Sequence, residues 1–162
     1  MVQLLIDYAN KKKIILELNE KDEDGWYPLL YATYLNNIKI IQLLMDYAKN
    51  NKIILELNKK NNYGSYPLLF ATDENNIEIV QLLMDYANKN KIILELNEKD
   101  EDGWYPPLRA TDKDNIEMVQ LLIDYATENK NILKLNEKNK YGDYPLLRAT
   151  YENNIEMIKL LM

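Results

Sequence analysis

The 162-residue chain is 47% hydrophobic and 28% charged, as folded globular domains are, and no apolar run is long enough to span a membrane. Its net charge of -6, with only two arginines, repels phosphate backbones, so we expect neither a membrane nor a nucleic-acid partner. Cysteine and histidine are both absent, which removes thiol nucleophiles, the commonest general base and the commonest metal ligands. We therefore expect no enzyme, no metal site and no cofactor. The composition does not fix a compartment, and the cytoplasm is only slightly favoured.

The chain repeats itself every 39 residues. Tyr-Pro recurs at Pro28, Pro67, Pro106 and Pro145, and the four glycines share one phase, at Gly25, Gly64, Gly103 and Gly142. A fixed period of this length indicates stacked structural repeats, each unable to bury its own hydrophobic face alone. We predict an all-α repeat solenoid of stacked helix-turn-helix units, with short extended or turn segments between them.

Alternate repeats are more alike than neighbours. The first and third read NEKDEDGWYP, whereas the second and fourth read NKKNNYGSYP and NEKNKYGDYP, so the duplicated unit is a pair of repeats. The first residues, MVQLLI, and the last, MIKLLM, have the same phase, that of the second helix of a repeat. We expect residues 1–162 to form a single array of about four repeats within a longer array.

Each repeat is expected to contain two helices. Proline suits a first helical turn, so Pro28 predicts a short helix from about Pro28 to Leu35. Asn36 and Asn37 interrupt it, because asparagine tolerates left-handed geometry and caps a following helix. A second helix is predicted from Ile38 to about Asn50. Its polar stripe is narrow, so the helix should contact its own first helix and both neighbouring repeats; Tyr47, Ala48 and Tyr86 are expected in the core.

A short segment follows the second helix, and its sequence leaves two structures open. Alternation of Leu55 and Leu57 with Glu56 predicts a short extended strand or loop leading to a tight turn at glycine. Continuation of the helix through Ile53 and Ile54 is the alternative, because periodicity cannot separate the two over so few residues.

The repeats resemble the ankyrin repeat, a β-turn followed by two helices with the pattern T-P-L-H-x-A. The corresponding segments here read YPLLYA, YPLLFA, YPPLRA and YPLLRA. Tyrosine replaces threonine and leucine replaces histidine, so apolar contact should replace the family's hydrogen bonds at this helix start. The period is also about six residues longer than the family's, and the added residues follow the second helix.

The positions that differ among repeats are free to specify a partner. The resemblance implies that turn tips and first helices line a concave binding side, and aromatic and arginine side chains are enriched at binding hot spots. The expected partner-binding residues are Trp26, Tyr31, Tyr34, Phe70, Trp104, Arg109, Arg148 and Tyr151. An alternative for Trp26 and Trp104 is that each lies across the adjacent turn and seals the stack.

The carboxylates of the turns, such as Asp22, Glu23 and Asp24, lack the ligand spacing of a dedicated calcium loop and are expected to be solvated. We expect the chain to be a non-catalytic protein-protein interaction or scaffold module, with a protein partner whose identity the sequence does not reveal. The alternative is a structural, self-associating spacer or filament. Such an assembly grows when the open end of one array stacks on the next.

Overall fold

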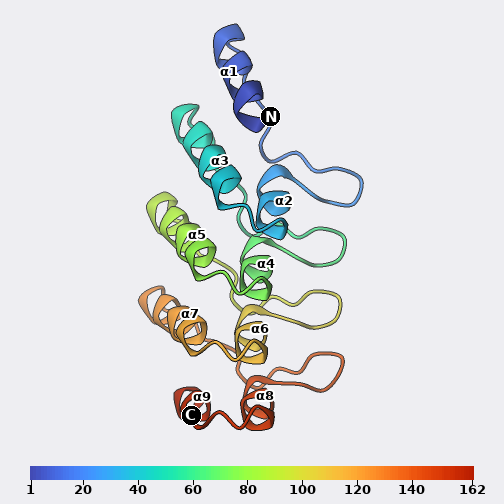
Figure 1. Cartoon of the computed structure of the whole chain (residues 1–162), viewed down its shortest axis with the longest axis vertical. Coiled ribbons are helices and arrows are strands. Elements are labelled where there is room, and N and C mark those ends of the chain that lie inside the picture. The colour runs from blue at the N-terminus through green and yellow to red at the C-terminus, as the bar shows by residue number, and fades with distance from the viewer.

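The computed structural model describes residues 1–162 as an elongated stack in which first helices, second helices and turns form three columns side by side (Figure 1). The helices are α1 (Val2–Lys12), α2 (Pro28–Tyr34), α3 (Ile38–Asn50), α4 (Pro67–Asp73), α5 (Ile77–Asn90), α6 (Pro106–Asp112), α7 (Ile116–Glu128), α8 (Pro145–Tyr151) and α9 (Ile155–Leu161). None of them is long and apolar enough to cross a membrane. The predicted all-α solenoid is confirmed, and α1 and α9 both have the phase of a second helix.

The first helices, α2, α4, α6 and α8, begin where the sequence predicts. Each starts at a proline whose missing N–H would have had no partner in a first turn, and the preceding tyrosine is in an extended conformation. In α2 the hydroxyl of Thr33 donates to the carbonyls of Leu29 and Leu30, so this polar side chain is satisfied although it is fully buried. The first helices are therefore short, and most residues of α4 and α6 are buried, whereas α2 and α8 keep exposed side chains.

Asparagines join the two helices of a repeat, as the sequence predicts. Asn36 has a φ of 51°, and the side chain of Asn37 accepts a hydrogen bond from the N–H of Ile40 at 3.1 Å. The second helix α3 ends at Asn50, and Lys52 turns the chain away with a φ of 58°. Helix therefore does not continue through Ile53 and Ile54, and the segment before the turn is an irregular loop without a strand.

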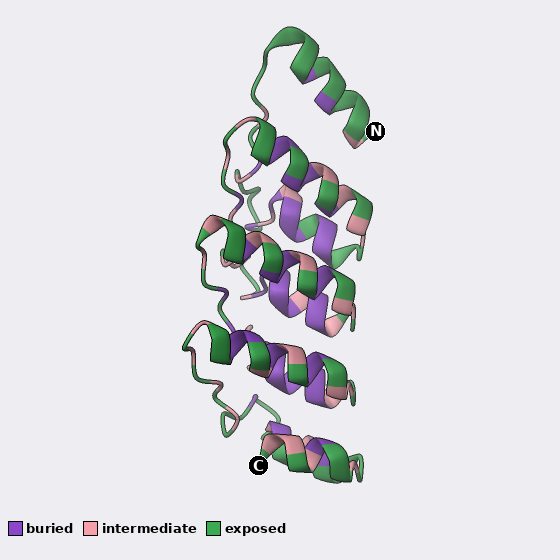
Figure 2. Ribbon diagram, turned by 90° about the vertical axis from the view of Figure 1, so that its left-hand side faces the viewer, coloured by how far each residue is buried: buried purple, intermediate pink, exposed green.

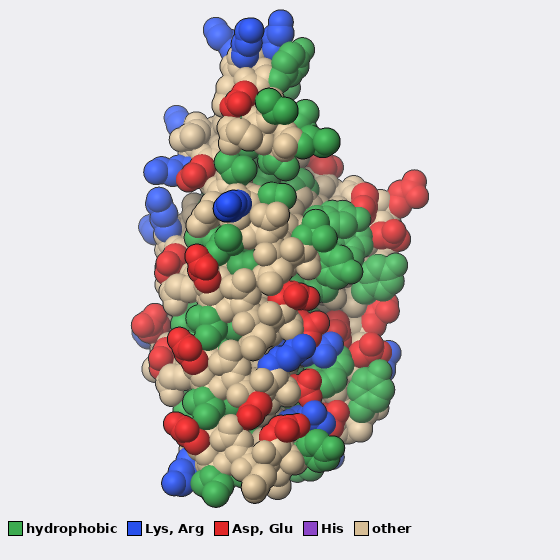
Figure 3. Space-filling view, viewed as in Figure 1, with side chains coloured by type: hydrophobic (Ala, Val, Ile, Leu, Met, Phe, Trp, Pro, Cys, Tyr) green, Lys and Arg blue, Asp and Glu red, His purple; other side chains and the backbone are tan.

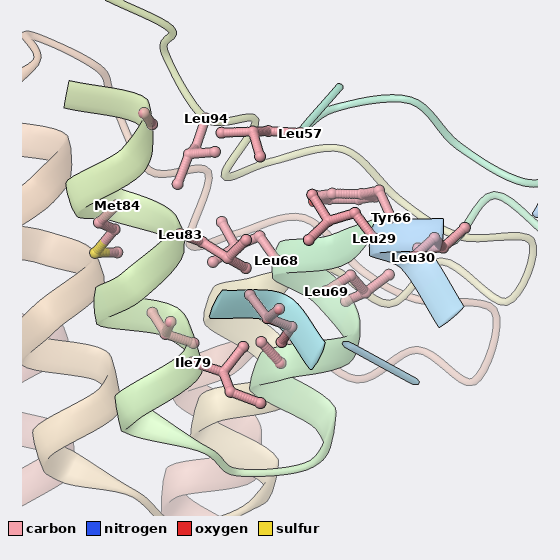
Figure 4. Packing of buried hydrophobic residues seen from close by; sticks show 14 of the residues in the cluster. Leu29, Leu30, Leu57, Tyr66, Leu68, Leu69, Ile79, Leu83, Met84 and Leu94 are labelled. Carbon is pink, nitrogen blue, oxygen red and sulfur yellow. The ribbon is translucent and has the colours of Figure 1, made fainter. Parts of the chain in front are cut away.

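The core is one continuous cluster of buried side chains that runs between the two columns of helices from Ile6 to Met157 (Figure 2). In its middle, Leu68 of α4 lies beside Leu83 of α5, whereas Leu69 lies on the other side of α4, toward Leu29 and Leu30 (Figure 4). Tyr47 and Ala48 are buried as predicted, whereas Tyr86 is only partly buried. Each repeat thus shares its hydrophobic side chains with its neighbours, as stacked repeats require.

Hydrogen-bond ladders also join the repeats, and asparagine builds the clearest of them. The side chain of Asn58 donates to the carbonyl of Ile93 at 2.8 Å and accepts from the N–H of Glu95 at 3.1 Å. Asn19 and Asn97 make the same two bonds to the repeats that follow them. The backbone N–H and C=O groups of these loops are not paired in a sheet. Asparagine side chains of the preceding repeat bond to some of them instead.

Tyrosines form two further ladders. The hydroxyl of Tyr86 accepts from the N–H of Leu55 in the preceding repeat at 3.0 Å, and the buried Tyr47 accepts from the N–H of Leu16 in the same way. The tyrosine before each proline reaches the other way, and Tyr66 donates to the carbonyl of Glu98 at 3.0 Å while its ring is fully buried. The tyrosine that stands in place of the family's threonine thus contributes a hydrogen bond from its hydroxyl to the next repeat, in addition to apolar contact.

Lysines connect the turns. Lys60 Nζ lies 2.7 Å from a carboxylate oxygen of Glu98, and Lys99 Nζ lies 2.8 Å from one of Glu137. The lysine hydrogen bond is also the largest cause of a lowered pKa at Glu98. Near the tips, Lys140 Nζ is 3.7 Å from Asp102. The turns are thus joined by opposite charges on neighbouring repeats.

Asn58→Ala is expected to lower the free energy of unfolding by about 1 kcal/mol, because two side-chain hydrogen bonds to the next repeat are lost in a partly exposed setting. Asn136 has the same position in the last repeat and makes no such bonds, so Asn136→Ala should cost less than about 0.5 kcal/mol. Urea denaturation of both variants measures the difference. Equal losses would contradict a stabilising role for the ladder.

Pro107 stands where other repeats have leucines such as Leu29 and Leu68, which are fully buried. It lies in the first turn of α6, where an N–H has no helical partner. Pro107→Leu should leave the fold intact and raise the free energy of unfolding by about 0.5 kcal/mol, because added burial exceeds the lost stiffness of the unfolded chain. Thermal unfolding followed by circular dichroism checks this, and a clear fall in Tm would contradict it.

Candidate functional site

The turns that flank the first helices are built by one acceptor side chain each. A carboxylate oxygen of Asp22 accepts the N–H groups of Asp24 and Trp26, at 3.1 and 2.8 Å. In the second repeat the side-chain oxygen of Asn61 does the same for Tyr63 and Ser65. Aspartate and asparagine are interchangeable here because both offer an oxygen. Each turn thereby places the residue before Tyr-Pro at the corner between turn and first helix.

Residues that vary between repeats meet at this corner and form one stripe along the stack. We call it the variable stripe: Trp26, Tyr31, Tyr34, Phe70, Asp73, Trp104, Arg109, Asp112, Arg148 and Tyr151. It contains all eight residues that the sequence nominated. Figure 3 shows hydrophobic side chains gathered on the upper part of this face and basic and acidic side chains interleaved below them.

The upper part is an aromatic cluster of Trp26, Tyr31, Tyr34 and Phe70. The indole of Trp26 stacks on the ring of Tyr31, with centroids 4.6 Å apart, and on that of Phe70 at 5.5 Å. Tyr34 meets the rings of Trp26 and Phe70 edge-on at 5.3 and 5.2 Å. The cluster joins the first two repeats, yet Tyr31 remains 44% and Tyr34 48% exposed. It therefore offers rigid aromatic surface to a partner.

The lower part is a ladder of ion pairs between successive first helices. Arg109 Nε lies 3.4 Å from a carboxylate oxygen of Asp73, which Lys113 Nζ also approaches at 3.5 Å. One repeat later, Arg148 lies 2.6 Å from Asp112. All of these side chains are partly buried. The two arginines that the sequence nominated for binding are thus already paired within the chain.

Each arginine also lies over an aromatic ring. The guanidinium carbon of Arg109 is 3.9 Å from the ring centroid of Trp104, and that of Arg148 is 5.1 Å from that of Tyr151. Trp104 therefore stacks on a cation, whereas Trp26 stacks on other rings. Trp26 also reaches Phe70 of the next repeat, and both tryptophans keep part of their surface accessible.

The eight nominated residues do not include Asp73 and Asp112 of the stripe or Lys113 beside it, although all three are at positions that differ among repeats. A signal for the ion pairs was present in the sequence. Asp73 lies three residues after Phe70, the counterpart of Arg109, and Asp112 lies three residues after Arg109, the counterpart of Arg148. Stacking brings the aspartate of one repeat beside the arginine of the next. Aspartates at this position thus serve as partners for arginine rather than as free binding groups.

The electrostatics of the site follow from burial. Burial raises the pKa of Asp100, while the N–H groups of Trp104 and Asp102 and the charge of Arg109 oppose that rise. No three Asp or Glu side chains come close enough together to hold a metal ion. The geometry provides aromatic surface and paired charges, which suit recognition of another molecule by contact.

Two observations now assign the family: each unit is a turn followed by two antiparallel helices, and the units repeat along one axis. The family model for ankyrin repeats, in three copies, matches residues 1–93 and again residues 90–162. The chain belongs to the ankyrin-repeat family. No curated protein matched it in sequence.

Ankyrin repeats are generally non-catalytic modules for protein-protein interaction. The family assignment therefore agrees with the expectation of a binding module and leaves the partner open. Within the ankyrin stack seen here, the variable stripe lies between the turns and the first helices, whereas the second helices carry the same glutamine-aspartate bonds in several repeats, as at Gln81 and Asp85. Differences between repeats are thus concentrated on one face.

Proposed function

We propose that this ankyrin array is a scaffold that binds a protein partner through the variable stripe. The observation that carries the proposal is the contiguity of the residues that differ among otherwise similar repeats. Ring stacking links Trp26 to Phe70, and ion pairs link Asp73 to Arg109 and Asp112 to Arg148. Aromatic and arginine side chains in such a continuous surface are the residue types that dominate binding energies.

Rigidity supports the same function. The partly exposed rings and guanidinium groups of the stripe are held by neighbours on two successive repeats, so little side-chain entropy would be lost on binding. The exposed surface of the stripe is therefore preorganised for binding and not flexible.

The absence of cysteine makes the test simple, because a single introduced cysteine is a unique attachment point. Tyr34→Cys and Tyr151→Cys place a benzophenone crosslinker on the stripe, and Gln81→Cys places it on the exposed face of α5 as the control. Irradiation in an extract of the source cells should give the same adduct from both stripe positions and none from the control. Unlabelled chain should compete with it. Equal adducts from all three positions would overturn the proposal.

Self-association is a second candidate function, favoured by apolar surface at both ends of the stack that residues 1–162 form. A groove of about 380 Å³ beside α1 and α2 is lined mainly by apolar side chains, among them Leu5 and Leu35. At the opposite end, Leu146 and Leu147 of α8 are 37% and 43% exposed, whereas Leu68, the counterpart of Leu146 in α4, is fully buried. The groove has the position that α2 takes on α4, so α8 of a second copy would fit it.

Register sharpens the test of self-association. Met157–Met162 have the phase of Met1–Ile6, so a second copy stacked in register would bring α9 onto the place of α1. Removing Met157–Met162 should therefore strengthen concentration-dependent association, and Leu147→Asp should weaken it. Sedimentation velocity over a concentration series measures both. A truncated chain that stays monomeric at every concentration would contradict this candidate.

A further inference from the structure

The aromatic cluster differs from the rest of the variable stripe in having no charge of its own. Its rings contact one another, and no lysine or arginine lies over them, whereas Arg109 covers Trp104 and Arg148 approaches Tyr151. Nearly half of the surface of both Tyr31 and Tyr34 faces solvent. The indole of Trp26 is stacked against Tyr31 and Phe70, so the surface that a cation from outside the chain can reach is the exposed part of Tyr31 and Tyr34.

Acidic side chains stand beside this cluster without ion-pair partners. Asp22, Glu23 and Asp24 form the tip of the first turn and are exposed, and no lysine or arginine lies within 4.0 Å of their carboxylates. The third turn has the same Asp-Glu-Asp sequence, but there Lys140 approaches Asp102, and the charge of Arg109 opposes the rise that burial causes in the pKa of Asp100. Figure 3 shows acidic side chains projecting beside the hydrophobic gathering. The first turn therefore carries a negative charge that the fold does not neutralise.

The third repeat indicates what complements such a corner. There a guanidinium group lies 3.9 Å from an indole ring and 3.4 Å from a carboxylate of the preceding repeat. The first repeat has the same tryptophan, but Tyr31 stands where the third has Arg109. The first repeat therefore supplies aromatic surface and the carboxylates of its own turn, in place of one at the position of Asp73, and it lacks the cation. A cation over an aromatic face is attracted by the ring quadrupole, and adjacent carboxylates add to that attraction.

We propose that the aromatic cluster, together with the first turn, binds a basic segment of the partner protein, in which arginine or lysine lies next to an aromatic or large aliphatic side chain. The cation takes a place over the rings between Tyr31 and the carboxylates of Glu23 and Asp24, and the apolar side chain packs on Tyr34 and Phe70. The net charge of -6 steers such a segment toward the chain. This inference rests on the proposed binding function of the stripe and specifies the chemistry of its partner.

The experiment is selection of random peptides displayed on phage against the whole chain. The peptides enriched should carry arginine or lysine beside an aromatic residue or leucine. Synthetic copies are then titrated by calorimetry against Tyr31→Ala/Tyr34→Ala, which should bind about tenfold more weakly or worse, because hot-spot rings are removed. Tyr63→Ala/Tyr141→Ala removes two exposed tyrosines of the turns and should bind as the unmodified chain does.

Charge is tested separately. Glu23→Gln/Asp24→Asn leaves the carboxylate of Asp22 that organises the turn and should weaken binding several-fold, with a smaller loss in high salt. Glu101→Gln/Asp102→Asn makes the same change in the third turn, whose tryptophan is already covered by Arg109, and should have little effect.

Each outcome decides between the inference and the function on which it rests. Acidic or uncharged peptides, no enrichment, or binding insensitive to Tyr31→Ala/Tyr34→Ala would overturn the inference. If the selected peptides depended instead on Arg148 and Tyr151, binding through the stripe would stand while the basic segment would not. If no substitution in the stripe altered their binding, both would fail.

Discussion

Gly103→Ala is expected to destabilise the chain several times more than Gly142→Ala, although the two glycines occupy the same place in the turn. Both have φ near +85°, at 83° and 86°, where a Cβ atom costs about 1 to 2 kcal/mol whatever surrounds it. At Gly103 the added carbon would also lie 2.8 Å from the Cα of Asn139 in the next turn, while at Gly142 it would meet nothing within 4 Å. Backbone, unlike a side-chain tip, cannot move aside cheaply.

We expect a loss of about 1 kcal/mol in the free energy of unfolding for Gly142→Ala and of about 3 kcal/mol or more for Gly103→Ala. Urea titrations read by circular dichroism measure both midpoints, and a constant slope would show that the unfolded states are comparable. Similar losses would mean that neighbouring turns are not in close contact. The bond from the N–H of Lys140 to the carbonyl of Asp102, at 2.9 Å, would then also be in doubt.

The second large effect is expected for Leu83→Ala in the middle of the stack. Leu83 is fully buried between its own first helix and the neighbouring repeats, so truncation should cost about 3 kcal/mol through lost burial and the cavity left behind. Leu5 has the same position in α1 but is 58% exposed, so Leu5→Ala should cost less than about 1 kcal/mol.

Repeat stacks give this comparison a second readout. Stability in a linear array is a sum over repeats and their interfaces, so a weak central repeat uncouples the two halves. Leu83→Ala should therefore broaden the unfolding transition or split it in two, whereas Leu5→Ala should leave it single. A single sharp transition with a small midpoint shift for Leu83→Ala would contradict the linear description.

Local rules explain why the sequence predicts the helices so closely. The first helix begins at Pro28 as expected and ends one residue earlier than predicted, at Tyr34, and α3 has the predicted limits of Ile38 and Asn50. Proline, asparagine and the apolar period act within a few residues, so they can be read from a single repeat. The loop after the second helix was ambiguous for the opposite reason: what fixes it is the amide of an asparagine such as Asn58, which belongs to another repeat.

The sequence indicated which residues belong to the candidate site better than it indicated how those residues interact. The eight nominated residues come from positions that vary among repeats, and the structure brings them together in one stripe along the stack. Their pairing was missed because it depends on which side chains become vertical neighbours: Arg109 meets Asp73 one repeat back, while Trp26 meets Phe70 one repeat forward. Sequence spacing gives the phase within a repeat, and only the stack gives the direction in which each side chain reaches.

The alternating charges of the turns constrain how copy number can change during evolution. Loss of the second repeat would bring the Asp-Glu-Asp tip of the first turn directly against the identical tip of the third, although Lys21, which has the position of Lys60, would still face Glu98. Loss or gain of two repeats restores every neighbour. Unequal recombination within such a gene should therefore leave viable lengths that differ by 78 residues, in keeping with the near identity of the first and third turns.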